Sequence, residues 1–351
     1  MPKLKAVILV GGPGMRLRPL TDGIPKSVVP VLNRPFMEHM FAYLRKHGIR
    51  DIILTLNYRP EVIQGIFGDG AGHGVRLTYC LEREPKGTAG AVKNAEEYLD
   101  GTFVVLNGDV FTDMDLSAMI TYHSEKKARA TISLSWVANP SAFGVVDTDS
   151  EQRVKRFIEK PPSGEETTNW INAGTYVLEP EVLAHIPADV HYMFEKGLFP
   201  DLLDKGHPVY GYPYRGYWLD MGTPEKYFTL NADLMLSRVN GPIPSGLGLR
   251  GIHRDRGVTI DPSATLTAPV MVGKGSRIGP RSTIRGPVII GRDCRIEDGV
   301  ILENAVIWDR VTIGAGCHLR HCVISSRSTI SSGQSFDNCV YTPAKQVALG
   351  I

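Results

Sequence analysis

The feature that most constrains the fold is a bulky apolar residue that recurs at every sixth position in the C-terminal part of this 351-residue chain. Nine consecutive positions share the spacing, after which the register slips by one and the pattern continues. They are Ile260, Leu266, Val272, Ile278, Ile284, Ile290, Ile296, Leu302 and Trp308, followed by Ile313, Leu319, Ile324, Ile330, Phe336 and Tyr341. A six-residue period is typical of a parallel β-helix, in which each hexad forms one face of a triangular prism and its bulky residue points inward. We therefore predict a β-helix over residues 257–345.

The residues two positions before each of these are nearly all small or β-branched, which suits the tight inner corners of a prism. Four of the five cysteines fall at such positions, and we interpret them as small packing residues. They are Cys294, Cys317, Cys322 and Cys339. A metal site formed by His318, His321 and Cys322 is the alternative interpretation.

The N-terminal part alternates between strand and helix patterns. Strands are predicted at 4–10, 52–56, 75–80, 102–106, 130–137, 154–159 and 173–178, and helices at 36–47 and 89–99. This order predicts a Rossmann-like α/β domain with a mostly parallel sheet covered on both faces. Ligands of such sheets bind beyond the carboxyl ends of the strands. We place this domain at residues 1–238 and a linker rich in Gly and Pro at 239–256.

Composition narrows the class of protein. The 39 Lys and Arg residues nearly balance the 37 Asp and Glu residues, which argues against nucleic acid as the main partner. No apolar run approaches the roughly 18 residues that suggest a membrane span, so we expect no membrane partner. The five cysteines show no CxxC spacing, and no signal peptide is evident. We therefore expect reduced thiols and a cytoplasmic protein.

The first predicted strand leads into a turn that is suited to a nucleotide. Gly11, Gly12 and Gly14 expose backbone N–H groups that can face phosphate oxygens, and the guanidinium of Arg16 can bind phosphate with two parallel hydrogen bonds. The turn lacks both the GxGxxG dinucleotide motif and the GK[ST] of a P-loop. Lys26 follows between two prolines and is either a rigidly placed cation or a solvated surface lysine.

Six segments in order resemble the sugar nucleotidylyltransferases, also called nucleotide-sugar pyrophosphorylases. The resemblance covers nearly the whole chain, because family members can also carry a C-terminal left-handed β-helix after a glycosyltransferase-A-like catalytic domain. The segments are the GGPGMRLRPLT turn with its following PKSVVPVLNRP run, Glu84–Ala91, Leu106–Asp109, Phe157–Pro161, Asn172–Gly174 and Tyr217–Pro224. Met15 stands where the family usually has Thr or Ser, and Ser27 where a second Pro is common.

The resemblance implies transfer of a nucleoside monophosphate from a nucleoside triphosphate to a sugar 1-phosphate, with release of pyrophosphate. Such chemistry depends mainly on positioning and charge neutralisation. Arg16 would neutralise the β- and γ-phosphates, Lys26 would bridge the α-phosphate and the sugar phosphate, and Lys160 would hold the sugar phosphate. Asp109 and Asp220 would hold Mg²⁺. Asp109 could instead cap a helix, Asp220 could be a turn residue, and Glu159 with Lys160 could be a surface ion pair.

The resemblance also implies two sets of recognition residues. Besides Arg16, Lys26 and Asp109, the nucleotide would contact Leu9, Gly11, Gly12, Gly14, Met15, Gly87, Thr88, Ala89, Gly90, Asn107 and Gly108. Besides Lys160, the sugar phosphate would contact Gly144, Glu159, Asn172 and Gly174.

The sequence constrains the substrate specificity and the oligomeric state less than it constrains the fold. The motifs are most similar to those of mannose-1-phosphate guanylyltransferases, so GTP and mannose 1-phosphate are the favoured substrates, with glucose-1-phosphate uridylyl- or thymidylyltransferase activity as the alternative. A non-catalytic regulatory subunit, or a second acyltransferase activity with His318 or His321 as base, are further alternatives. The open ends of the β-helix predict a homo-oligomer, a dimer or tetramer.

Overall fold

The computed structural model describes residues 4–239 and 251–350, which fall into two compact units that do not follow the chain order. Unit 1 contains the residues up to Gly12 and Met40–Trp218. Unit 2 contains Pro13–His39 and the described residues from Leu219 onward. The predicted linker at 239–256 lies mostly outside the described residues. Its last part contains β14 (Ile252–Arg254), which pairs in parallel with β17 (Val270–Val272) of the β-helix.

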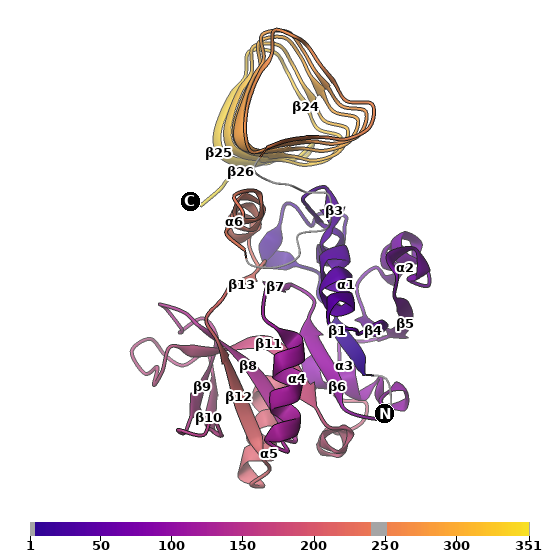
Figure 1. Cartoon of the computed structure of the whole chain (residues 1–351), viewed down its shortest axis with the longest axis vertical. Coiled ribbons are helices and arrows are strands. Elements are labelled where there is room, and N and C mark those ends of the chain that lie inside the picture. The colour runs from indigo at the N-terminus through magenta and orange to yellow at the C-terminus, as the bar shows by residue number, and fades with distance from the viewer. Residues whose placement is uncertain (1–3, 240–250, 351) are drawn as a thin grey trace. The chain divides into compact units, whose positions relative to one another are not determined.

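The centre of unit 1 is a parallel sheet whose strands end at one edge (Figure 1). The register places Leu9 opposite both Asn107 and Thr55, and Thr55 opposite Cys80. The apolar run of the first strand is buried, as expected of a strand covered on both faces. The strands, in their order across the sheet, are β6 (Phe103–Asn107), β1 (Lys5–Leu9), β4 (Asp51–Leu56) and β5 (Arg76–Leu81).

Antiparallel strands extend this sheet and make it mixed. The long strand β11 pairs with β6 on one side and with β8 on the other, and β9 and β10 form a hairpin beside it. These strands are β8 (Ala130–Trp136), β9 (Gly144–Thr148), β10 (Val154–Glu159) and β11 (Trp170–Leu178). β12 (Val209–Tyr214) pairs in parallel with β8. The predicted mixed Rossmann-like sheet is confirmed, although β9 and β12 were not predicted.

Helices begin and end where local sequence signals place them. α1 (Phe36–Lys46) confirms the helix predicted at 36–47 and ends before Gly48, whose φ is 78°. The helix predicted at 89–99 is shorter, since α3 (Gly87–Lys93) is followed by a separate 3₁₀ turn, Glu96–Tyr98. The other helices are α2 (Pro60–Phe67), α4 (Leu116–Glu125), α5 (Phe199–Asp204) and α6 (Pro224–Met235). Shorter turns are Met15–Leu17, Lys26–Val28, Ala71–His73, Pro180–His185 and the π-turn Phe194–Leu198.

The C-terminal part of unit 2 is a β-helix of triangular cross-section (Figure 1). One sheet contains β14, β16 (Thr265–Thr267), β17, β19 (Thr283–Ile290), β21 (Ile301–Ile307), β23 (His318–Ile324), β25 (Ser335–Tyr341) and the antiparallel β26 (Gln346–Ala348). The other contains β15 (Thr259–Ile260), β18 (Arg277–Ile278), β20 (Arg295–Ile296), β22 (Thr312–Ile313) and β24 (Thr329–Ile330). Short strands complete the chain: β2 (Pro30–Val31), β3 (Arg34–Pro35), β7 (Val110–Thr112) and β13 (Trp218–Asp220).

The predicted inward position of Trp308 is wrong, and the cause is a shorter corner in the β-helix. Arg285 pairs with Glu303 and Val288 with Ala305, so two residues before Val288 stand opposite a single residue, Asn304. The slip therefore occurs before Ile307, which aligns with Ile290 and Ile324 in the buried core. Trp308 comes next, and its indole N–H donates to a residue of α6.

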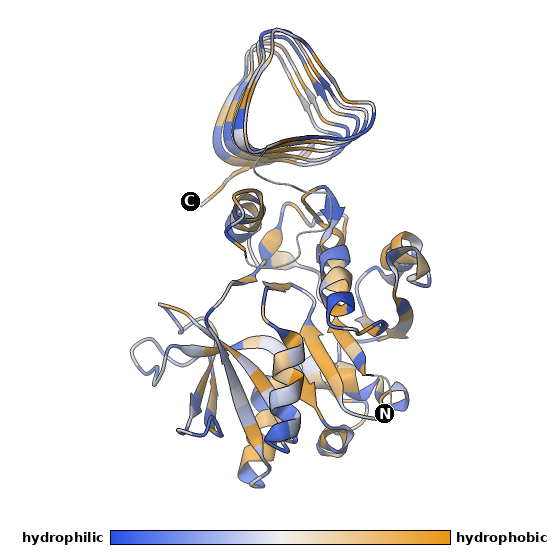
Figure 2. Ribbon diagram, in the orientation of Figure 1, coloured by the Kyte–Doolittle hydropathy of each residue, from blue (hydrophilic) through white to orange (hydrophobic). Residues whose placement is uncertain are grey.

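The remaining hydrophobic predictions agree with the structure. All five cysteines are buried and free, and the four in the β-helix belong to its core, which confirms their packing role. Figure 2 shows the strands of the central sheet as mainly hydrophobic. Within the described ranges, no helix is both long and apolar enough to cross a membrane.

Candidate active site

In unit 1, polar groups collect at the carboxyl edge of the parallel sheet. Gly11 follows β1, Asn57 follows β4, Glu82 follows β5 and Asp109 follows β6. The common strand register brings these ends to one edge. Gly108 can only be glycine here, because a Cβ would lie 2.4 Å from the carbonyl oxygen of Leu9. This edge is where α/β sheets bind ligands.

Glu82 is the residue at this edge that sequence reasoning missed. Its side chain is buried, and burial raises its pKa, although the backbone N–H of Lys86 donates to Oε2 at 2.9 Å and opposes the shift. A Cβ on Gly11 would lie 3.8 Å from Oε1 and 3.7 Å from Cβ of Asn57, so the carboxylate faces the glycine turn. The only available signal was its position directly after a strand predicted to be parallel.

The segment predicted to contact base and ribose is held tightly against another part of unit 1. The N–H groups of Ala89 and Gly90 both donate to the carbonyl oxygen of Tyr192 at 3.0 and 2.9 Å. A Cβ on Gly87 would lie 2.6 Å from the same oxygen. The Thr88 hydroxyl donates to Glu195 at 3.0 Å. Close backbone packing therefore accounts for the glycine at Gly87, and the first amides of α3 are already bonded.

Two carboxylates, buried Glu195 and half-buried Glu159, lie next to this segment. The side chain of Glu159, at the end of β10, occupies space that is free because residue 144 is glycine. A Cβ on Gly144 would lie 2.8 Å from Oε2 of Glu159. Burial raises the pKa of Glu159, and the negative charge of Glu195 raises it further. Burial also raises the pKa of Glu195. Lys160 stands beside them, with its Nζ 3.8 Å from Glu159 Oε1 and most of its side chain exposed.

Asn172 connects these carboxylates to the end of β6. Its amide donates to the Tyr176 hydroxyl at 2.8 Å, and its Oδ1 accepts the N–H of Gly174 at 3.0 Å. Gly174 has a φ of 73°, and a Cβ there would lie 2.5 Å from the side chain of Asn107. The charges of Glu195, Glu159 and Asp109 all act on Tyr176. Unit 1 therefore brings Asp109 and the predicted sugar-binding residues into one neighbourhood.

In unit 2, cations converge on one carboxylate. Asp220 Oδ2 lies 3.5 Å from Lys226 Nζ and 3.7 Å from Arg16 Nη2, and Oδ1 lies 3.9 Å from Lys26 Nζ. The side chain of Asp220 is only 13% exposed. Since one carboxylate cannot neutralise all the surrounding cations, a net positive charge remains that suits a polyanion.

Glycines shape the surroundings of this cluster. A Cβ on Gly222 would lie 3.0 Å from both oxygens of Asp220 and 3.1 Å from Arg16 Nη2. Gly14 has a φ of 67°, and its Cβ would lie 3.0 Å from that of Lys26. The side chain of Lys26 is 12% exposed, so it is no solvated surface lysine.

The other expected residues are placed as follows. The side chain of Met15 is largely exposed, Gly12 has open space around it, and Leu9 ends β1. Asp109 does not cap α4, because Asp115 does so by accepting the N–H of Ala118 at 3.1 Å. Asp220 lies in a charged environment and also in a turn. In this turn the N–H of Gly222 donates to the carbonyl oxygen of Asp220 at 2.8 Å.

The two aspartates offer oxygen ligands of the kind that Mg²⁺ prefers. Asp220 Oδ1 is buried and accepts no hydrogen bond from residues 4–239 or 251–350. Across these residues, no cluster of three or more His, Cys, Asp or Glu side chains could hold a metal by itself. A magnesium ion would then depend on substrate oxygens and water for most of its ligands, as it usually does with phosphate substrates.

Two family models match the chain and together span most of it. A model described as nucleotidyl transferase matches residues 5–236. A model described as the LbH domain of EIF2B subunit epsilon matches residues 250–348.

Curated relatives align over most of the chain. Mannose-1-phosphate guanylyltransferase of Mycobacterium tuberculosis is 38% identical over 90% of this chain and 82% of its own length. UTP–glucose-1-phosphate uridylyltransferase of Synechocystis is 34% identical over 90% of this chain and 86% of its own length. Mannose-1-phosphate guanyltransferase of Debaryomyces hansenii is 39% identical over 75% of this chain and 73% of its own length.

Solved structures share the architecture of the N-terminal part. A structure assigned to a glucose-1-phosphate thymidylyltransferase of Bacillus anthracis aligns with a TM-score of 0.61 and 25% identity, over 68% of this chain and 97% of that one. HddC of Yersinia pseudotuberculosis aligns with a TM-score of 0.57 and 30% identity, over 66% of this chain and 99% of that one.

Proposed function

Because the chain belongs to the nucleotidyl transferase family and is a sugar-1-phosphate nucleotidyltransferase with a left-handed β-helix, we propose that its substrates are GTP and mannose 1-phosphate. The products are then GDP-mannose and pyrophosphate. Two of the relatives above carry the guanylyl- or guanyltransferase name, whereas another relative and a similar structure act on glucose 1-phosphate by their names. The proposed preference for guanine therefore rests on the residues of the site.

The observation that carries the guanine preference is the carboxylate of Glu82 behind the Gly11 turn. The Watson–Crick edge of guanine presents two neighbouring donors, the ring N–H and the exocyclic amino group, and a carboxylate accepts both. Uracil and thymine present one N–H between two carbonyl oxygens, which a carboxylate would repel. Oε2 of Glu82 already accepts the N–H of Lys86, while Oε1 accepts no hydrogen bond from the part of the chain that the structure describes.

The proposed reaction is attack by a phosphate oxygen of mannose 1-phosphate on the α-phosphorus of GTP. The new P–O bond forms as the bond to pyrophosphate breaks. Arg16 neutralises charge on the leaving pyrophosphate, Lys26 lowers the repulsion between the α-phosphate and the incoming phosphate, and Lys160 holds the sugar phosphate. Half-buried Lys26 is the most constrained of the three, because Gly14 packs on its Cβ.

Asp109 and Asp220 are the residues we propose to hold Mg²⁺, which when bound polarises phosphate oxygens and offsets their charge. Glu159 and Asn172 are proposed to face the sugar hydroxyls. A carboxylate is a fixed acceptor, and Gly144 leaves the room that Glu159 needs.

Pyrophosphate release tests the specificity. The purified protein is assayed with GTP, UTP, dTTP, CTP and ATP, each with mannose 1-phosphate and with glucose 1-phosphate, in the presence of Mg²⁺. We expect the highest kcat/KM for GTP with mannose 1-phosphate. A preference for dTTP or UTP with glucose 1-phosphate would overturn the proposed substrates and favour the alternative activity.

Asp109→Asn separates the enzyme from a regulatory subunit that only binds nucleotide sugars. The variant keeps the size of the side chain and removes its charge, so it should lose Mg²⁺-dependent turnover and retain the wild-type melting temperature. Unchanged activity would exclude the metal-binding role of Asp109. The charged residues expected of a catalyst, which a regulatory relative could lack, are all present: Arg16, Lys26, Asp109, Lys160 and Asp220.

Two further expectations concern the location of the protein and the histidines of the β-helix. The location stays a prediction from the cysteine usage. His318 and His321 pair with Glu303 at 3.7 Å and Asp337 at 3.7 Å on partly exposed side chains, so they are engaged in ion pairs between coils when protonated.

A further inference from the structure

The segment that carries Lys26 is bonded to the β-helix through a chain of buried hydrogen bonds, all within unit 2. The indole N–H of Trp308 donates to the hydroxyl of Tyr227 at 2.8 Å, and that hydroxyl donates to the carbonyl oxygen of Pro30 at 2.6 Å. Tyr227 is fully buried and Trp308 is 5% exposed. The phenolic oxygen therefore uses both its acceptor and its donor capacity, and water cannot replace either partner.

Two further bonds hold the next residues of the same segment. The N–H of Leu32 donates to Oδ1 of Asn231, one turn beyond Tyr227 on α6, at 3.0 Å. The side-chain amide of Asn33 donates to the carbonyl oxygen of Ile290 in β19 at 2.8 Å. The segment is thus fixed at Pro30, Leu32 and Asn33, in part by α6 and in part by the β-helix directly.

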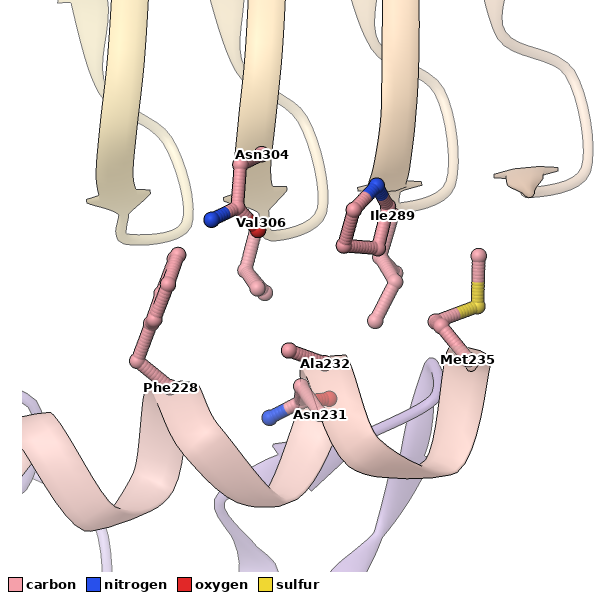
Figure 3. A pocket seen from close by; sticks show the side chains of 8 residues that line it. Phe228, Asn231, Ala232, Met235, Ile289, Asn304 and Val306 are labelled. Carbon is pink, nitrogen blue, oxygen red and sulfur yellow. The ribbon is translucent and has the colours of Figure 1, made fainter. Parts of the chain in front are cut away.

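α6 also packs against the β-helix through apolar side chains. Figure 3 shows Phe228, Ala232 and Met235 of α6 facing Ile289 and Val306. The space between these side chains leaves no room for a water molecule. Apolar contacts of this kind are not directional, whereas the hydrogen bond from Trp308 to Tyr227 is, so it adds a directional restraint on where α6 lies along the β-helix.

The same segment and helix carry the charged cluster. The 3₁₀ turn Lys26–Val28 leads directly into Pro30, and the N–H of Val29 donates to the carbonyl oxygen of Lys26 at 3.2 Å. Lys226, next to Tyr227, approaches Asp220, which also pairs with Lys26. A shift of Tyr227 would therefore move both the backbone that carries Lys26 and the cation beside Asp220.

We propose that Trp308 is a positioning residue of the nucleotidyl transfer reaction: through Tyr227 and Pro30 it sets the position of Lys26, although it belongs to the β-helix. This inference rests on the proposed role of Lys26. Loss of the indole N–H leaves the phenol with one partner and allows α6 and the Lys26 turn to shift together. Charge neutralisation at the α-phosphate then weakens in the transition state, while the substrates retain their other contacts.

The expected effect appears in kcat. A displacement of about 1 Å at a reacting group can lower the rate roughly 100-fold, so Trp308→Phe should lower kcat by about 10- to 100-fold with little change in either KM. Tyr227→Phe removes both hydrogen bonds of the phenol, the one from Trp308 and the one to Pro30, without changing the shape of the ring, and should give at least as large a loss. Because both residues act in one chain, the double variant should lose no more than the more affected single variant.

The test measures kcat, both KM values and amide hydrogen exchange of peptides that cover residues 26–33, using the full-length protein well below its melting temperature. Tyr341→Phe is the matched control, since it removes a phenolic hydroxyl from the same β-helix, where it lies 3.5 Å from the carbonyl oxygen of Thr329. We expect faster exchange over 26–33 and lower kcat in Trp308→Phe and Tyr227→Phe, and wild-type values in Tyr341→Phe.

Lys26→Met separates the proposed role of Lys26 from the proposed positioning role of Trp308. If Lys26→Met is inactive and both aromatic variants keep the wild-type kcat, the positioning role is excluded and the proposed function stands. If Lys26→Met itself keeps full activity, the proposed role of Lys26 fails, and the positioning role fails with it. Additive losses in the double variant, or unchanged exchange over 26–33, would also overturn the positioning role. A lower melting temperature with unchanged kcat would leave Trp308 a purely structural residue.

Discussion

At the scale of single residues, the candidate site combines carboxylates that are shielded from solvent with positively charged side chains. Glu82 and Glu195 are buried and Glu159 is half-buried, and the loss of hydration raises the pKa of each carboxyl group. Buried charges of this kind cost stability unless a ligand or a hydrogen bond compensates them, and they are therefore most often found where they serve binding.

Glu82→Gln tests the base specificity. The amide has one donor where the carboxylate has only acceptors, so it loses a charge-assisted hydrogen bond to guanine and can instead pair with uracil or thymine. We expect kcat/KM for GTP to fall roughly 10- to 100-fold, as for loss of a hydrogen bond to a charged group, and that for UTP to rise. Kinetics with both nucleotides measures this, and an unchanged ratio of the two constants would show that Glu82 does not face the base.

Glu195→Gln tests the cost of a buried carboxylate through its pH dependence. Because folding raises the pKa of Glu195 above 4.5, the folded state holds this proton more tightly, and the contribution of the carboxyl to stability falls as the pH rises through the folded-state pKa. The neutral variant should melt at a higher temperature than wild type near pH 8, and the gain should vanish towards pH 4.5.

Glu303→Gln is the control, because it should change the melting temperature in the opposite direction. The hydrogen-bonded guanidinium of Arg285 lowers the pKa of Glu303, so its stabilising contribution is present at neutral pH and lost in acid. This variant should melt lower than wild type near pH 8. Equal pH profiles for the two variants would contradict the assignment of the shift in Glu195 to burial.

At the scale of elements, periodicity predicts what repeats and misses what depends on a partner far along the chain. The hexad spacing predicts the coils of the β-helix and the burial of its cysteines, because each hexad contacts only its neighbours. The one-residue shortening at Asn304 could not be located, since both Ile307 and Trp308 are bulky and apolar. Their assignment depends on the opposite strand, where Gly286 and Pro287 occupy the corner.

The glycines of the candidate site show the same limit. Motif spacing marks Gly87 and Gly90 as special, but their constraint is the backbone at Val190 and Tyr192, about a hundred residues away in sequence. Glu82 could not be identified because its role depends on the shared register of β5 and β1. By contrast, the family motifs marked Arg16, Lys26 and Asp220, which lie together, but not Lys226 of α6, which also approaches Asp220.

Gly174→Ala tests whether β11 needs glycine beside Asn107, where the pairing of the strand with β8 is irregular. Alanine would meet both an unfavourable φ of 73° and the amide of Asn107 at 2.5 Å. We expect a loss of about 1–3 kcal/mol in the free energy of unfolding together with lower activity. Gly206→Ala is the control, because its φ is 72° but nothing lies within 4 Å of the added Cβ. Equal losses in both variants would show that backbone strain alone is responsible.

At the scale of the whole molecule, the β-helix belongs to the same unit as Arg16 and Lys26, two cations that we propose to bind phosphate, although they are distant in sequence. Lys160 belongs to the other unit. Residues 13–39 cluster with the C-terminal part, and Lys345 pairs with Asp22 of the same N-terminal segment at 3.1 Å. A domain that serves only assembly would not need such bonds. We therefore expect the position of the β-helix to affect the chemistry as well as the stability.

We also expect the chain to form a homo-oligomer, in part through the β-helix. The two outer strands of its larger sheet are β14 and β26, and outer strands present unpaired backbone groups that proteins usually cover. Sedimentation at micromolar concentration should give a mass of a dimer or tetramer. A monomer under these conditions would contradict this expectation.

The most direct test of the proposed reaction follows the oxygen atoms of the sugar phosphate. The protein is incubated with GTP, Mg²⁺ and mannose 1-phosphate that carries oxygen-18 in its non-bridging phosphate oxygens, and the products are analysed by mass spectrometry. Attack by the sugar phosphate on the α-phosphorus predicts GDP-mannose that retains all the label and pyrophosphate that carries none. Labelled pyrophosphate, or the absence of GDP-mannose while GTP is consumed, would contradict the proposed reaction.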